Sequence, residues 1–193
     1  MTWEWLDQRP LIVAIAGPNG AGKTTFFHAH IAPSGLRFVN TDVLAGHLEM
    51  DAYLAATVAA SLRAELVRQR ESFAFETVFS DPVGDKLTFL KQAVADGYQV
   101  LLCYIGLANA EMSEARVAMR VAQGGHDVPS EKIFSRFPRT MANLKSAVLD
   151  LPHVMVFDNS NLASPYRRIA VFERGRLTER VQPFPRWFRE LVS

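Results

Sequence analysis

The segment from Gly17 to Thr24 has residue types and a spacing that suit the binding of a phosphate chain. Glycines let successive backbone N–H groups face a phosphate, a lysine can neutralise the β- and γ-phosphates, and a threonine hydroxyl can ligate Mg²⁺. An apolar run precedes the segment and a helical pattern follows it, which disfavours a chance glycine-rich turn. The segment fits GxxxxGK[ST] at every fixed position, and we predict nucleotide binding by Gly17, Pro18, Asn19, Gly20, Ala21, Gly22, Lys23, Thr24 and Thr25. Lys23 is also predicted to be catalytic, and Thr24 to ligate Mg²⁺.

Two acidic residues follow segments that we expect to be strands. Asp42 comes after FVNT, and Glu76 stands near the end of SFAFETV, directly before Thr77. Doubly wound sheets bind their ligands at the carboxyl ends of the strands, so both carboxylates could face a substrate. We predict that Asp42 accepts the proton of a substrate hydroxyl, although N-capping of the next helix explains this residue equally well. Glu76 and Thr77 are predicted to bind substrate, and Glu76 also to contact the metal through water.

Four arginines lie close together on both sides of Gly124-Gly125. Arg116 and Arg120 share one helix face, and Arg136 and Arg139 stand on either side of Pro138. Phosphoryl transfer depends on cations around the migrating group, whereas the alternative for each arginine is a solvated helix charge. We predict a lid over about residues 110–140 in which at least one of these arginines contacts the phosphates.

Companion motifs decide between the protein classes that use a phosphate-binding loop. The sequence contains no LSGGQ-like segment, no NKxD motif and no apolar strand that ends in Asp-Glu. These absences disfavour a transporter ATPase, a GTPase switch and a typical ATPase, and favour a kinase that acts on a small molecule. The segment Asp158-Asn159-Ser160 would either hold the edge of a nucleobase or form a turn. His126 is interpreted as a loop residue.

Short apolar runs alternate with helical patterns, which predicts an α/β fold with a mostly parallel sheet flanked by helices. We expect strands at about 11–16, 36–40, 72–78, 98–105 and 153–157, and a hairpin or edge strand at 169–173 and 177–181. We expect helices at about 23–31, 53–70, 83–96, 110–122 and 129–149, the last kinked or restarted at Pro138. In the helix at 53–70, the spacing of Leu54, Val58, Leu62 and Leu66 predicts an apolar stripe with the arginines on other faces. No linker or repeat is visible, so residues 1–193 are expected to form one domain.

The composition is that of an ordinary globular protein. The 193 residues include 21 Lys and Arg and 20 Asp and Glu, a formal net charge of +1, which favours neither nucleic acid nor a membrane as a partner. The only cysteine, Cys103, lies in an apolar run and is expected to be buried. No signal-peptide pattern is visible and no apolar run approaches the ~20 residues that span a bilayer, so we expect a cytoplasmic protein.

These segments together resemble the zeta toxin family of P-loop kinases, in particular its short bacterial branch often labelled as predicted ABC-type ATPases. The matching segments run from about Leu11 to Ser160 and include AGPNGAGKTT, FVNTD, FAFETVFSD, RVAMRVAQGGHDVP, RFPRTMANL and VFDNS. The resemblance implies a P-loop NTPase fold of the nucleoside-kinase-like type with a small helical lid. It implies ATP and Mg²⁺ at Lys23 and Thr24, and Asp42 as the base. It further implies that Glu76 contacts substrate or metal and that Arg120 is a lid residue that stabilises phosphate.

The implied acceptor is a sugar hydroxyl of a nucleotide sugar such as UDP-N-acetylglucosamine, and a protein antitoxin is a partner to consider. The loop VFSDPVGDK departs from the glycine-rich substrate loop of the larger family members, and Arg136 and Arg139 both compete for the second lid position. Two alternatives stay open. One is a kinase for another metabolite, nucleoside or antibiotic. The other is a nucleotide-binding regulatory protein without transfer activity, in which Asp42 would be dispensable.

Overall fold

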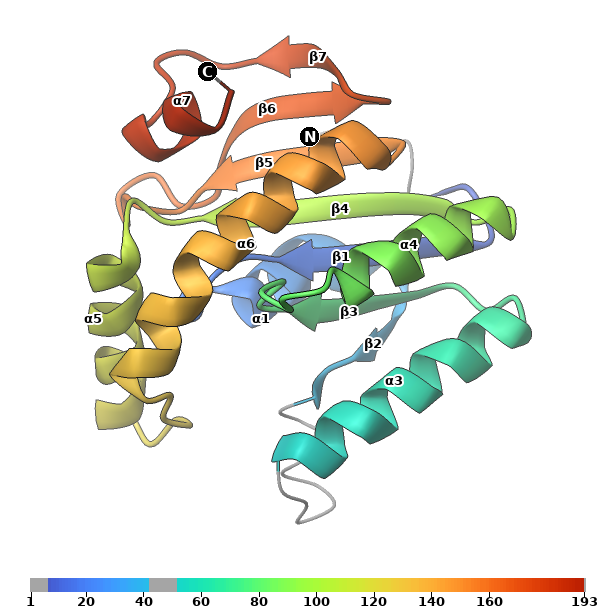
Figure 1. Ribbon diagram of the computed structural model, residues 1–193, viewed down its shortest axis with the longest axis horizontal. Helices are drawn as coiled ribbons and strands as arrows, with labels where there is room; N and C mark the ends of the chain where they lie inside the picture. The colour runs from blue at the N-terminus through green and yellow to red at the C-terminus, as the bar shows by residue number, and fades with distance from the viewer. Residues whose placement is uncertain (1–6, 42–51, 193) are drawn as a thin grey trace.

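The computed structural model describes residues 7–41 and 52–192, which build a sheet covered by helices on both faces (Figure 1). The sheet has seven strands in the order β2-β3-β1-β4-β5-β6-β7. The first five strands along the chain are parallel, and they are β1 (Leu11–Ala16), β2 (Arg37–Val39), β3 (Phe73–Thr77), β4 (Gln99–Gly106) and β5 (His153–Asp158). An antiparallel hairpin of β6 (Arg167–Glu173) and β7 (Arg176–Arg180) extends the edge next to β5.

The uninterrupted apolar strand β1 occupies the middle of the parallel part of the sheet. It pairs with β3 on one side and β4 on the other, and all its residues are buried. A strand covered on both faces needs apolar side chains in both directions, which is why LIVAIA shows no alternation. The loop that leaves its carboxyl end therefore starts from a rigid position.

Helices connect the parallel strands β1 to β5. The chain after β1 forms α1 (Lys23–Phe26), a π-helical turn (Phe27–Ile31) and a 3₁₀ turn (Ala32–Ser34). The remaining helices are α3 (Ala52–Arg68), α4 (Asp85–Ala95), α5 (Ala110–Ala122), α6 (Ser130–Asp150) and α7 (Arg186–Val192). No helix in the described ranges is both long and apolar enough to cross a bilayer.

Two apolar cores lie on opposite faces of the sheet. The larger core takes side chains from α3, α4, α6 and α7, which lie on the viewer's side of the sheet in Figure 1. The smaller core takes Phe26, Phe27 and Ile31 from α1 and the turn after it. Thus α1 covers the opposite face from α3 and α4.

The expected strands and helices are confirmed, with ends that differ by a few residues. At Pro138 a kink or a restart of the helix is expected, and the structure excludes the restart. The helix α6 runs without a break from Ser130 to Asp150, so it is not restarted at Pro138. Pro138 and Phe134, the residue four positions before it, are both exposed, so water can solvate the carbonyl group that loses its donor.

One prediction is corrected, and it concerns the buried side of α3. Leu54 is 46% exposed, whereas the buried row consists of Ala55, Ala59, Arg63 and Leu66. Two alanines in this row let the helix approach the sheet closely and leave room for a long side chain between them and Leu66. Arg63 therefore points to the protein side of the helix, and the prediction that the arginines of this helix lie on other faces is wrong for it.

Candidate active site

The glycines of residues 17–24 are required by close packing of the loop against its neighbours. Gly17 has φ +143°, and a Cβ atom there would lie 2.2 Å from the carbonyl oxygen of Ile105 in β4. At Gly20, with φ +71°, a Cβ atom would lie 2.9 Å from atoms of Ser113 and Arg116 in α5. The loop is thus held between β4 and α5, in a backbone conformation that residues with side chains rarely adopt.

Lys23 lies within this loop and is only 9% exposed. Its Nζ atom donates hydrogen bonds to the carbonyl oxygens of Gly17, at 3.1 Å, and Pro18, at 3.0 Å. The Oδ1 atom of Asn19 is buried and has no hydrogen-bond partner among the described residues. A buried polar atom without a partner is costly, so an unsatisfied group in this loop points to a ligand.

Thr24 and Glu76 bring two oxygen ligands together at the end of the loop. The Thr24 hydroxyl donates to Oε2 of Glu76 at 2.7 Å. Carboxylate and hydroxyl oxygens suit Mg²⁺, which usually completes its shell with water and the phosphates of a substrate. Within the described ranges no group of three His, Cys, Asp or Glu side chains could hold a metal on its own. This pair therefore fits a metal that arrives with a nucleotide.

A cavity of about 750 Å³ opens over the loop and is rich in positive charge. Its wall includes residues 19, 20 and 22–25 of the loop region, together with Glu76, Thr77 and Thr41. Among the described residues that line the cavity, cations outnumber acids. The acids are Glu76, Asp81 and Asp127, and the cations are Lys23, Arg63, Lys86, Arg116, Arg120, Lys132, Arg136 and Arg139. A concave surface with such an excess of cations attracts and holds anions.

The four predicted lid arginines all line this cavity, but their side chains have different contacts. Arg116 donates to the carbonyl oxygens of Asn159, at 2.6 Å, and Ser160, at 3.4 Å, and Arg120 donates to that of His126 at 2.6 Å. Arg139 donates through Nε to the carbonyl oxygen of Ser80 at 3.0 Å. For Arg136 no such contact is found within the described ranges. Its guanidinium group is thus the most available of the four.

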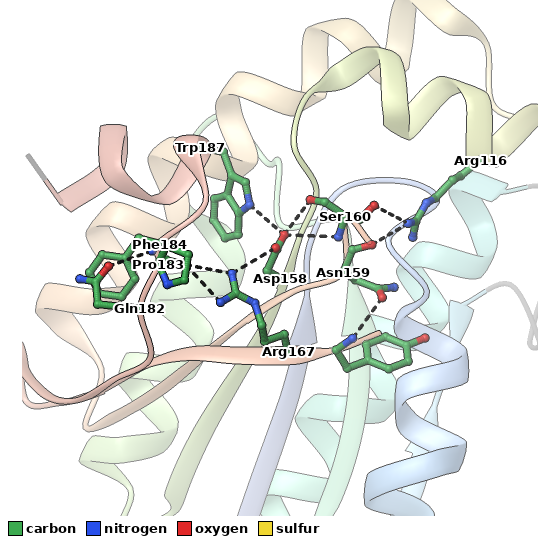
Figure 2. A network of polar contacts seen from close by, with 10 residues as sticks. Arg116, Asp158, Asn159, Ser160, Arg167, Gln182, Pro183, Phe184 and Trp187 are labelled. Carbon is green, nitrogen blue, oxygen red and sulfur yellow. Dashed lines mark hydrogen bonds and ion pairs between the residues drawn. The ribbon is translucent and has the colours of Figure 1, made fainter. Parts of the chain in front are cut away.

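The turn at residues 158–160 is tied into the protein by its side chains, as Figure 2 shows. Asp158 accepts hydrogen bonds from the Trp187 indole at 3.1 Å and from the Ser160 hydroxyl at 2.6 Å, and Arg167 lies 3.7 Å away. The carboxylate therefore anchors α7 and the turn itself. Of the two readings of this segment, the contacts of Asp158 favour turn formation.

Asn159 and Tyr166 connect this turn to the phosphate-binding loop. Asn159 donates from Nδ2 to the Ala21 carbonyl oxygen at 2.9 Å, and the Tyr166 hydroxyl donates to that of Gly22 at 3.0 Å. Burial raises the pKa of the Tyr166 hydroxyl above its ordinary value, which keeps the proton that this hydrogen bond needs. These two side chains fix the loop from the side of β5 and β6, and Arg116 holds the turn that carries Asn159.

The loop after β3 is held by α6. The Thr140 hydroxyl donates to the Val78 carbonyl oxygen at 2.7 Å, and Asn143 donates to those of Phe79, at 3.0 Å, and Asp81, at 3.1 Å. Phe79 has φ +60°, a conformation that a phenylalanine keeps only when its surroundings impose it. The Thr77 hydroxyl accepts a hydrogen bond from the Phe79 backbone at 3.0 Å, so it supports the turn.

The structure thus brings together most of the residues that the sequence predicts for this site. Lys23, Thr24, Thr25, Glu76, Thr77 and the four arginines line one cavity. Asp42, the predicted base, lies outside the described residues.

Sequence reasoning missed Arg63, Tyr166, Asn143 and Thr140. Thr140 and Asn143 lie in the segment RFPRTMANL, where the arginines drew the attention, and Tyr166 lies outside the matching segments. Arg63 left a signal in its place in line with Ala55 and Ala59 on α3.

Comparison with known proteins places this cavity in a wider context. A model of the zeta toxin family matches residues 49–169 of the chain. No curated protein matches it. Solved structures share the fold, as predicted. One is the AvrRxo1-ORF1:AvrRxo1-ORF2 complex with sulphate ions, which is 18% identical with a TM-score of 0.75 over 98% of this chain and 66% of that chain.

Two further solved structures share the fold at similar identity. The PezAT chromosomal toxin-antitoxin system of Streptococcus pneumoniae is 16% identical with a TM-score of 0.60, over 78% of this chain and 69% of that chain. A gluconokinase from Sinorhizobium meliloti is 15% identical with a TM-score of 0.50, over 82% of this chain and 86% of that chain. The chain spans 66% and 62% of two matched AvrRxo1 chains, and at these identities the likeness concerns the fold.

Proposed function

The chain belongs to the zeta toxin family, and from this premise we propose that it transfers the γ-phosphoryl group of ATP to a hydroxyl group of a small molecule. One observation carries the proposal. Lys23, Thr24 and Glu76 share a single cavity with Arg136 and other cations, so a nucleotide donor and a second molecule can meet there. The cavity volume of about 750 Å³ falls in the range of small-molecule sites.

The donor side of the site uses residues 17–25. The backbone N–H groups of the loop and Lys23 bind the phosphates, and Thr24 and Glu76 hold Mg²⁺ directly or through water. When bound, the metal neutralises charge on the β- and γ-phosphates. ATP as the donor is supported by an AvrRxo1-ORF1:-ORF2 complex solved with ATP, a structure with a TM-score of 0.61 to this chain.

Two charged side chains act in the transfer step itself. Asp42 accepts the proton that the acceptor hydroxyl loses as its oxygen attacks the γ-phosphorus. Arg136 stabilises the charge of the migrating group, because no other contact within the described ranges engages it. Arg120 serves the same group after its bond to the His126 carbonyl oxygen is exchanged for a phosphate oxygen.

The acceptor proposed is a nucleotide sugar of the UDP-N-acetylglucosamine type, which the family resemblance implies. A protein antitoxin is proposed as a partner, since PezAT is described as a toxin-antitoxin system. We also propose that the protein acts in the cytoplasm, where ATP is available, and that residues 1–193 form a single domain.

A transfer assay tests the proposal. We expect labelled γ-phosphate from ATP to appear on UDP-N-acetylglucosamine or on another member of a metabolite panel with wild-type protein and Mg²⁺. Lys23→Met should abolish transfer, and Asp42→Ala should reduce it by about 100- to 10,000-fold, as expected for a general base. Lys91→Met is the matched control, because Lys91 is exposed and pairs with Asp150 outside the cavity.

Tight ATP binding without transfer to any acceptor would instead identify a regulatory nucleotide-binding protein. Full activity of Asp42→Ala would remove the assigned base while leaving the kinase proposal in place.

A further inference from the structure

Arg63 is a buried cation at the wall of the cavity. It is 6% exposed, and its guanidinium carbon lies 5.1 Å from the ring centre of Phe75 and 5.8 Å from that of Phe89. The two rings hold the planar group in place and contribute cation–π attraction. The side chain nevertheless reaches the cavity, since Arg63 is among its lining residues.

No acidic side chain within the described ranges pairs with Arg63. The other α3 arginine near it, Arg68, forms an ion pair with Glu65 on the exposed side of the helix. Burial lowers the pKa of the Arg63 guanidinium, because a charged group loses hydration there and no described carboxylate compensates. A buried charge without a counterion is unfavourable, and a cation in this state that lines a cavity is a candidate for binding an anionic ligand.

The position of Arg63 separates it from the phosphates of the donor. The donor phosphates are expected at the start of α1, and this helix packs into the smaller core through its residue Phe26. Phe75, under Arg63, belongs to the larger core on the opposite face of the sheet, with α3 and α4. Arg63 therefore approaches the cavity from the face that α1 does not cover.

The charges of the cavity also exceed what one nucleotide needs. Mg²⁺-bound ATP is served by Lys23 and by lid cations such as Arg136, whereas Arg116 and Arg139 are engaged by backbone carbonyl groups. Arg63 and Lys86, from α3 and α4, remain on the other side of the cavity. The wall thus offers cations for a second anion.

We propose that Arg63 binds a phosphate or pyrophosphate group of the acceptor, so that the enzyme selects a phosphorylated acceptor over its neutral counterpart. This assignment rests on the proposed kinase function, because that function supplies the second molecule. The planar guanidinium can donate two parallel hydrogen bonds to phosphate oxygens, which a lysine cannot reproduce. The acceptor hydroxyl is then held at a fixed distance from the donor phosphates.

Binding of inorganic pyrophosphate tests the assignment without a transfer step. The protein is first saturated with a non-hydrolysable ATP analogue and Mg²⁺, so that residues 17–25 are occupied, and pyrophosphate is then titrated by calorimetry. We expect binding to wild type, a loss of at least about 10-fold in affinity for Arg63→Met, and a smaller loss for Arg63→Lys. Arg68→Met, the same change on the exposed side of α3, should bind as wild type does.

Thermal melts establish that each variant is folded. If Arg63→Met does not fold, Arg63→Gln provides the same comparison with a polar head that can reach the cavity. Absence of pyrophosphate binding to wild type, or equal affinity in the folded Arg63 variants, would overturn the assignment.

Kinetics separate this assignment from the kinase proposal. If transfer occurs, Arg63→Met should raise KM for UDP-N-acetylglucosamine by about 10-fold or more and leave KM for ATP unchanged. Transfer to N-acetylglucosamine itself should be insensitive to the change. If wild-type protein phosphorylates N-acetylglucosamine with the same efficiency as UDP-N-acetylglucosamine, the kinase proposal stands and the role of Arg63 in acceptor selection is contradicted. If wild-type protein binds pyrophosphate but transfers phosphate to no acceptor, the result would contradict the proposed kinase function and leave the role of Arg63 in anion binding intact.

Discussion

Thr24 and Glu76 are separated by 52 positions in the chain and share a hydrogen bond of 2.7 Å beside the phosphate-binding loop. Glu76 stands directly after Phe75 in β3, so its backbone position is set by a buried strand that pairs with β1. The register places Glu76 opposite Ile15, one residue before the end of β1. The carboxylate thus lies where the loop begins, and its charge can act on a metal bound to Thr24.

Glu76→Gln should lower the affinity of the nucleotide site for Mg²⁺. The amide can still accept the Thr24 hydrogen bond, but the negative charge is lost, and partners of this kind typically alter metal affinity by about 10- to 100-fold. We expect the Mg²⁺ concentration that gives half-maximal binding of a fluorescent ATP derivative to rise by that factor. Glu71→Gln, an exposed change away from the cavity, is the control. An unchanged Mg²⁺ dependence would assign the carboxylate to the acceptor alone.

Residues in short local motifs are the ones that the sequence predicts well. The glycines, Lys23 and Thr24 are recognisable because a phosphate cradle needs those types within eight consecutive positions. Arg63 is not recognisable in this way, because its role depends on two rings, Phe75 and Phe89, that other elements supply. The spacing of leucines on α3 also concealed it, since the row toward the sheet begins with alanines.

At the scale of elements, α6 determines the shape of the loop after β3. Asn143 contributes two hydrogen bonds to carbonyl groups of this loop, and Thr140 a third. The same loop carries Asp81 to the cavity wall and leads into α4, whose second residue, Lys86, also lines the cavity. Helix and loop therefore behave as one unit on the acceptor side, and a change in α6 is expected to reach the acceptor and spare the nucleotide.

Asn143→Ala should raise KM for the acceptor with little change in KM for ATP. Two hydrogen bonds at about 0.5–1.5 kcal/mol each are lost, so the melting temperature should fall as well. Steady-state kinetics with each substrate varied in turn, together with a thermal melt, provide the measurement. Lys145→Ala removes an exposed side chain from the same helix and should leave both constants unaltered. An equal rise in both KM values would mean that the loop also shapes the nucleotide site.

The contact between β4 and α7 is equally specific. A Cβ atom at Gly106 would lie 2.2 Å from the Trp187 ring, and that ring donates its N–H group to Asp158. The absence of a side chain at Gly106 thus lets α7 pack onto the end of the strand. Because Asp158 begins the turn that supports the phosphate-binding loop, this packing is connected to the nucleotide site through Asn159.

Gly106→Ala should destabilise the protein by about 1–3 kcal/mol, the usual cost of forcing an extra group into a packed interior. The melting temperature provides the measurement. In a Trp187→Phe background the six-membered ring of the indole is absent, so the same substitution should cost less, and the difference is the coupling between the two positions. Equal costs in both backgrounds would show that the extra methyl group meets something other than Trp187.

Individual helices and strands can be predicted from the sequence because each one has a local pattern of apolar and polar residues. The five parallel strands were expected within a few residues, since apolar runs bounded by helical segments define them. Whether α6 continues or restarts at Pro138 stayed open, because this depends on where the helix is exposed, which periodicity does not report. The π-helical turn after α1 leaves no mark in the sequence either.

For the whole molecule, the α/β class follows from the alternation of strands and helices, whereas the strand order does not. The central place of β1 between β3 and β4 arises from contacts between residues that are distant in sequence. The same long-range packing places α1 on one face and α3, α4 and α6 on the other. In the proposed site this division places the donor and the acceptor on different faces of the sheet, and no local sequence pattern predicts it.

Cys103, the only cysteine of the chain, lies in β4 at the middle of the sheet, paired with Ile15 of β1 and Met155 of β5. It is fully buried, and burial raises the pKa of its thiol, so at neutral pH it remains protonated and unreactive. The native protein should therefore react with a thiol reagent only when the sheet opens, whereas the protein in denaturant should react at once. Rapid labelling under native conditions would contradict this.

The reactivity of Cys103 can therefore report how often the sheet opens. The rate at which the thiol reagent labels Cys103 in native buffer reports the free energy that separates the closed sheet from its opened form, at one defined residue and without an engineered cysteine. A non-hydrolysable ATP analogue that binds only the closed form should lower the labelling rate of Cys103 by the factor 1 + [L]/Kd, where [L] is the free analogue concentration, or about 100-fold at 100 times Kd. Occupancy of the nucleotide site can thus be timed at a sulfur atom in the centre of the sheet.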